Sequence, residues 1–91
     1  MNGDTDFDAV RKAAEQGDAK AQFFLGMMYA TGLGASFDYV QAHVWLSLAA
    51  SQQHSKAVTE RKFVATRMTF AQIVLAQELA RKWKSTSPGN E

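Results

Sequence analysis

The sequence contains no cysteine and a single proline, Pro88, among its 91 residues. The lack of cysteine excludes disulfide bonds and thiolate ligands for a zinc site. The lack of an earlier proline means that no residue of this type interrupts a helix in the body of the chain. Alternating runs of β-branched residues bounded by turn residues, the pattern of strands, are also missing. These absences favour an all-α protein.

Long apolar runs are absent too. No stretch approaches the roughly eighteen consecutive apolar residues of a membrane span. The first ten residues, MNGDTDFDAV, are acidic and lack the basic and apolar regions of a signal peptide. We therefore expect no membrane association and a cytoplasmic location, with a signal removed before residue 1 as the open alternative. The composition, 46% hydrophobic and 21% charged, is that of one ordinary globular domain.

Basic and acidic side chains nearly balance over the whole chain, but they are distributed unevenly along it. Residues 1–53 carry three basic and six acidic side chains. Residues 54–91 carry seven basic and three acidic side chains, and the net charge of the whole chain is +1. The sequence pI of about 8.1 is lower than that of most nucleic-acid-binding domains. We therefore expect a solvated basic face and no nucleic-acid partner. A phosphate-binding surface is the alternative use of Arg61, Lys62, Arg67, Arg81, Lys82 and Lys84.

Apolar residues recur at helical spacing in five segments of the chain. Short connections between helices of this length place neighbouring helices antiparallel. The final residues, STSPGNE, are small and polar, which predicts a disordered tail over 85–91. The pattern thus predicts one helical domain over 1–84, with helices at 5–16, 19–31, 38–52, 55–67 and 70–84.

Helix-terminating residues support these boundaries. Gly17 and Asp18 suit the end of one helix and the N-cap of the next. Gly32 suits the end of the second helix. Thr69 and Gln72 form a Thr-x-x-Gln capping box, which predicts the start of the last helix.

The sequence also repeats itself. The segment AAEQGDAKAQ (13–22) aligns with AASQQHSKAV (49–58) at an offset of 36 residues. A period of this size that spans two helices is typical of a helical solenoid. The identical pairs are Ala13 and Ala49, Ala14 and Ala50, Gln16 and Gln52, Lys20 and Lys56, and Ala21 and Ala57.

The stretch 17–53 resembles the Sel-one-like repeat, a relative of the tetratricopeptide repeat. Its first helix has the pattern Ala, Leu-Gly, Tyr and a closing Gly, and its second has Ala, an aromatic residue and Ala-Ala. The resemblance implies a short α/α solenoid in which 5–16 is a half unit, 17–53 a full repeat and 54–84 a degenerate C-terminal helical pair. The residues that carry the resemblance are Ala21, Leu25, Gly26, Tyr29, Gly32, Ala42, Trp45, Ala49 and Ala50.

Gly26 stands in the middle of a predicted helix, where glycine costs about 0.5–1 kcal/mol relative to alanine. A residue without a side chain allows the backbone of a facing helix to approach closely. We expect small residues opposite it in the second helix of the repeat, namely Ala42, Ala49 and Ala50. Burial of large neighbours, at about 1.5–3 kcal/mol each, would offset the cost.

One stretch resembles a calcium-binding loop. Asp4, Asp6, Asp8 and Glu15 fall at positions one, three, five and twelve of an EF-hand pattern. Position six requires glycine for its sharp turn, and this sequence has Ala9 there. We interpret the acidic residues as stabilising a helix N-terminus and expect no metal or other cofactor.

Two histidines are candidates for catalysis or metal binding. His43 and Ser47 lie one helical turn apart, the spacing of a base and a nucleophile, but no third residue is available to orient the imidazole. His54 stands 11 residues from His43, with no nearby third ligand for zinc. We interpret both as ordinary surface or half-buried histidines and expect a protein that is not an enzyme.

Apolar residues on the first helix of the repeat exceed what packing requires, because the related repeats often carry polar groups at Phe24 and Met27. We hypothesise that they anchor a polypeptide, with Phe23 at the edge and Lys20 and Thr31 as polar contacts. Packing within this small protein is the equally supported alternative. A homodimer that uses the same surface is the second functional hypothesis, because a solenoid usually needs about three repeats for stability.

Overall fold

The computed structural model describes residues 3–86, which form five helices and no strand. The helices are α1 (Gly3–Glu15), α2 (Ala19–Thr31), α3 (Tyr39–Ser51), α4 (Ser55–Ala65) and α5 (Phe70–Thr86). The predicted all-α class and helix order are confirmed. α1 begins before residue 5, and α5 continues through residues 85 and 86, which were wrongly predicted to belong to the tail. The rest of that tail, 87–91, lies outside the described residues.

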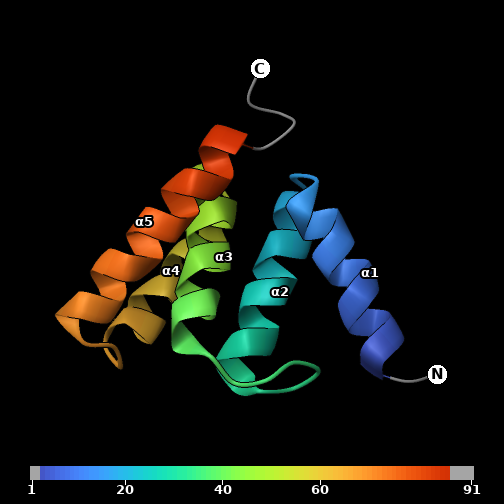
Figure 1. Cartoon of the computed structure of the whole chain (residues 1–91), viewed down its shortest axis with the longest axis horizontal. Helices are drawn as coiled ribbons and strands as arrows, with labels where there is room; N and C mark the ends of the chain where they lie inside the picture. Colours follow the sequence, from blue (N-terminus) through green and yellow to red (C-terminus); the bar gives the residue numbers. More distant parts are fainter. Residues whose placement is uncertain (1–2, 87–91) are drawn as a thin grey trace.

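Consecutive helices run antiparallel; α1, α2 and α3 follow one another side by side, and α4 lies behind α3 and α5 in the view of Figure 1. α3 occupies the centre and packs against α2, α4 and α5, whereas α1 packs on α2. The ring of Phe7 meets Tyr29 edge-on at 6.1 Å between centroids, which joins α1 to α2. This arrangement is the antiparallel helix-pair solenoid that the sequence predicts.

The internal repeat is also a repeat of turn geometry. Gly17 and Gln53 occupy equivalent positions after α1 and α3, and both have positive φ, 101° and 68°. The following residues, Asp18 and His54, are the N-caps of α2 and α4, and their side chains accept backbone N–H groups of the next helix. In each turn the backbone N–H of the N-cap residue also donates to an alanine carbonyl of the preceding helix. The distances are 3.1 Å from Asp18 to Ala13 and 3.2 Å from His54 to Ala49. The two turns therefore share one backbone design.

The predicted capping box is present at the start of α5. The backbone N–H of Gln72 donates to the hydroxyl of Thr69 at 3.1 Å, and the N–H of Thr69 donates to the side chain of Gln72 at 2.9 Å. These two backbone donors are satisfied locally, as the capping-box pattern predicts.

Two clusters of buried residues form the core. The first joins α1, α2, α3 and α5, because Leu25, Trp45 and Leu48 meet Ala76 and Ala80. The second joins α3 to α4 and is covered by half-buried residues of α2; its buried members are Ala42, Leu46, Ala49, Ala57 and Val64. α3 contributes to both clusters and is therefore the element on which the other helices depend.

Gly26 lies on α2 directly against α3. A Cβ atom at this position would stand 2.8 Å from Cγ of Leu46 and 3.2 Å from the carbonyl oxygen of Ala42. The expected close approach is confirmed, and Ala42 is one of its partners. Leu46, rather than Ala49 or Ala50, supplies the facing side chain. The branched Cγ of leucine fits against α2 only because position 26 has no side chain.

We predict that Gly26→Ala lowers the free energy of unfolding by about 1–3 kcal/mol through overpacking, although alanine is the better helix former. Urea denaturation followed by circular dichroism measures the change. In a Leu46→Ala background the same substitution should cost less, because the clashing side chain is gone. Equal costs in the two backgrounds would contradict the assignment of Leu46 as the limiting contact.

Gln53 provides a second prediction, because a non-glycine residue with positive φ is strained. Gln53→Gly should raise the free energy of unfolding by about 0.5–1 kcal/mol. The matched control is Gly17→Ala at the equivalent turn, where no heavy atom lies within 4 Å of an added Cβ. Gly17→Ala should lower the free energy of unfolding, because alanine is strained at positive φ. If Gln53→Gly and Gly17→Ala change the free energy of unfolding in the same direction, the two turns are not equivalent.

Candidate functional site

The five residues hypothesised to contact a partner lie on the outward face of α2. Lys20, Phe24 and Thr31 are exposed, and Phe23 and Met27 are half-buried. The opposite face of the helix carries the buried residues Gln22, Leu25 and Gly26. The helical repeat of 3.6 residues therefore separates a core-facing side from a surface that the fold itself leaves open.

Phe23 has a structural role as well as an exposed edge. Its ring stacks on the imidazole of His54, with 4.6 Å between centroids and an interplanar angle of 18°. His54 is in turn held by its role as N-cap, since Nδ1 accepts the N–H of Ala57 at 3.3 Å. Met27 packs against the second core cluster beside Phe23. These two residues therefore pack inward at the edge of the outer face, as the packing alternative predicts, and their contact with a partner stays a prediction.

Phe24 is the apolar residue of this face that packs against neither core cluster. Half of its surface, 50%, is exposed. Its ring touches that of Phe23 at 5.9 Å between centroids, so a fixed neighbour supports it on one side. Thr31, at the end of the face, donates its hydroxyl to the carbonyl of Met27 at 2.8 Å and accepts the N–H of Leu33. A partner can therefore use Thr31 only as an acceptor.

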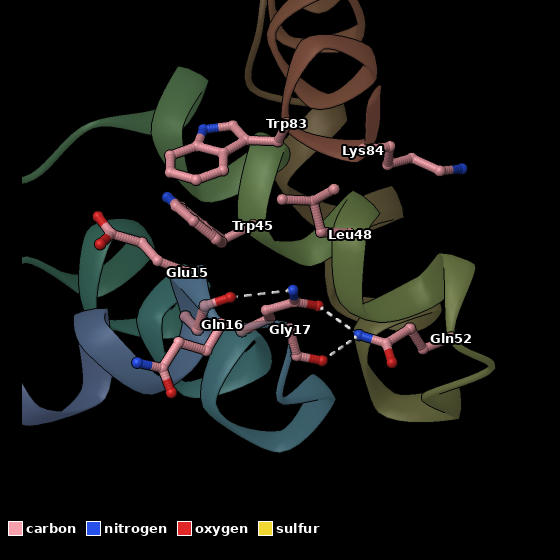
Figure 2. Close-up of a pocket in the computed structure, with 10 residues that line it drawn as sticks. Glu15, Gln16, Gly17, Trp45, Leu48, Gln52, Trp83 and Lys84 are labelled. Atoms are coloured by element: carbon pink, nitrogen blue, oxygen red, sulfur yellow. Dashed lines mark hydrogen bonds between the residues drawn. The ribbon is translucent and has the colours of Figure 1, made fainter. Parts of the chain in front are cut away.

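A pocket of about 280 Å³ lies between the α1–α2 turn, α3 and the end of α5 (Figure 2). The indoles of Trp45 and Trp83 form one wall, with 4.9 Å between ring centroids. On the other side, the amide of Gln52 donates to the carbonyl of Gly17 at 2.8 Å and to the side-chain oxygen of Gln22 at 3.0 Å. The pocket is smaller than the range of about 300–1,000 Å³ that is usual for organic ligands.

The side-chain amides of Gln22 and Gln52 are used in hydrogen bonds within the fold. Gln22, which is buried, also donates to the carbonyl of Ala14 at 3.1 Å. The two glutamines thus join α1, α2 and the end of α3 in one hydrogen-bonded junction. The sequence pattern predicts no role for either glutamine. The only available indication was that Gln52 is one of the residues that recur at the repeat offset.

His43 and Ser47 do meet, at 3.3 Å between Nδ1 and Oγ. His43 is buried in α3, and this burial, together with the positive charge of Arg61, lowers the pKa of the imidazole below its ordinary value. A catalytic histidine of the Ser-His-Asp type instead has a carboxylate that stabilises its charged form. No carboxylate bonds to His43 within residues 3–86. The environment therefore favours a neutral, structural imidazole.

The acidic residues of the EF-hand-like stretch lie on a helix. α1 covers the whole stretch, so the chain does not form a loop there. Arg11 pairs with Asp8 at 3.7 Å and with Glu15 at 3.1 Å along the helix. Within the described part of the chain, no group of three or more His, Asp or Glu side chains is placed to hold a metal ion. None of the helices in that part has the length and apolar character needed to cross a membrane.

No protein-family model and no curated protein matches this sequence. The structure is similar to the crystal structure of a protective antigen present in uropathogenic Escherichia coli strains, described as displaying an SLR fold. The TM-score is 0.87 and the sequence identity is 32% over 97% of this chain, which spans 19% of that longer chain. This similarity confirms the resemblance to Sel-one-like repeats drawn from the sequence. Helical repeats of this kind are interaction modules.

Proposed function

We propose that this chain, which has the Sel-one-like repeat fold, is a non-catalytic module that binds a polypeptide on the outer face of α2. One observation carries the proposal: Phe24 is half exposed on an otherwise well-packed helix. A large aromatic side chain that stays in water forgoes a burial worth about 1.5–3 kcal/mol. A partner that covers Phe24 would recover this free energy.

The surroundings of Phe24 suit a binding anchor. Phe23 is immobilised by His54 on one side, so the aromatic pair loses little freedom when a partner binds. Lys20 lies one turn before Phe24 and Thr31 two turns after it, which places polar groups around the apolar centre. Buried aromatic anchors surrounded by polar residues are the usual energetic centres of interfaces. These five residues line neither the Trp45–Trp83 pocket nor any enclosed cavity described above, so the proposed contact is to a helix face.

A second copy of this chain is the other candidate partner. α5 carries exposed apolar residues: Phe70 is 81%, Val74 39% and Leu75 50% exposed. A dimer that covers either α5 or the outer face of α2 would shield apolar surface. This alternative makes the stability of the protein depend on its concentration.

We expect Phe24→Glu to abolish capture of a polypeptide partner from the protein's own cell lysate, with affinity for that purified partner lowered about 30-fold or more. The charged side chain would have to be desolvated at the centre of the interface. Calorimetry with the purified partner gives the affinity. The matched control is Phe70→Glu, which makes the same change at an exposed phenylalanine on α5.

Each outcome distinguishes the candidates. A polypeptide retained by wild type and Phe70→Glu but lost with Phe24→Glu supports the α2 surface. Equal retention by both variants contradicts it. If only the chain itself is captured and its mass in sedimentation equilibrium depends on concentration, self-association is supported and binding of another polypeptide is contradicted. Circular dichroism of each variant verifies that it is folded.

A further inference from the structure

A cleft of about 560 Å³ opens between α3, α4 and α5. α3 packs against both other helices, but α4 and α5 make few direct contacts with each other. The space between them is therefore left unfilled on the side where Val58 and Arg61 of α4 face the C-terminal half of α5. This volume lies well within the range of small-molecule sites, about 300–1,000 Å³.

The walls of the cleft carry positive charge and no carboxylate. Arg61, Arg81 and Lys84 line it, and no Asp or Glu does. Glu78 pairs with Arg81, but the guanidinium has five donors and most of them stay available. Arg61 is half-buried and has no hydrogen bond or ion pair to any residue of the described chain. A partly desolvated charge without a counter-charge is costly, which favours an anion beside it.

Neutral groups complete the lining. Gln77 offers an amide without an intramolecular hydrogen bond, and Ser47 bonds only to His43. The hydroxyls of Ser51 and Ser85 donate to carbonyls of their own helices and can still accept. Apolar walls come from Ala50, Val58 and Ala80, so the cleft has space for an organic body as well as for an oxyanion.

We propose that this cleft binds a small organic phosphate, with Arg61 as the main anchor and Arg81 and Lys84 as supporting charges. Three cations suit a dianionic group better than a single carboxylate, and guanidinium groups match the geometry of phosphate oxygens. Of the six basic residues singled out in the sequence, these three converge. Arg67, by contrast, stacks over the ring of Phe63 at 4.1 Å. The site is separate from the outer face of α2 and does not depend on polypeptide binding.

The test is an NMR titration of the ¹⁵N-labelled full chain with phenyl phosphate, which combines a dianion with an apolar body. Amide shifts should concentrate at Ser47, Arg61, Gln77 and Arg81. Arg61→Gln should weaken binding about tenfold or more, as expected for loss of a charge-assisted hydrogen bond. Arg67→Gln, just beyond the end of α4 and with its guanidinium over the ring of Phe63, should bind as wild type does.

Phenyl sulfate, a monoanion of nearly the same shape, should bind more weakly than phenyl phosphate to wild type at neutral pH. If Arg61→Gln is poorly folded, Lys84→Gln serves as the second variant and should also weaken binding. The proposal is overturned if phenyl phosphate causes no saturable shifts, if the shifts lie outside the cleft, or if Arg61→Gln and Arg67→Gln bind equally.

Discussion

The close approach of α2 to α3 at Gly26 is the constraint on which the rest of this molecule depends. Leu46 occupies the space that a side chain at position 26 would need, with only 2.8 Å between its Cγ and such a Cβ. This contact fixes which side of α2 is buried. Because a helix turns 100° per residue, burying Leu25 and Gly26 leaves Lys20 and Phe24 on the opposite side. The proposed binding surface is thus a consequence of how the repeat packs.

α3 also determines how the second half of the chain packs. It supplies buried residues to both core clusters, with Trp45 and Leu48 in the first and Ala42 and Leu46 in the second. α5 packs on α3, in part through Trp83 and Trp45, and has little contact with α4. The cleft that carries Arg61 results from this arrangement. Both proposed sites lie on surfaces that the packing of α3 leaves uncovered.

Local signals in the sequence were sufficient for the helices, their order and most of their ends, because caps such as Gly17, Asp18 and Thr69 act within one turn of the chain. The partner of Gly26 was predicted less well, since sequence spacing does not determine where two helices cross. For the same reason, the stacking of Phe23 on His54 and the junction through Gln22 and Gln52 could not be foreseen. Equally, nothing in the sequence separates Arg61, which lines a cleft, from Arg67, which covers a phenylalanine.

Native-state hydrogen exchange of the free protein tests the central claim most directly, because it measures the stability of each helix within the intact fold. If the contact of α2 with α3 dominates, the slowest amides should lie in these two helices around Gly26 and Leu46. Amides of α1 and of the C-terminal part of α5 should exchange sooner, through local opening. If amides of α1 or α5 outlast those of α2 and α3, the contact at Gly26 is not the basis of the fold.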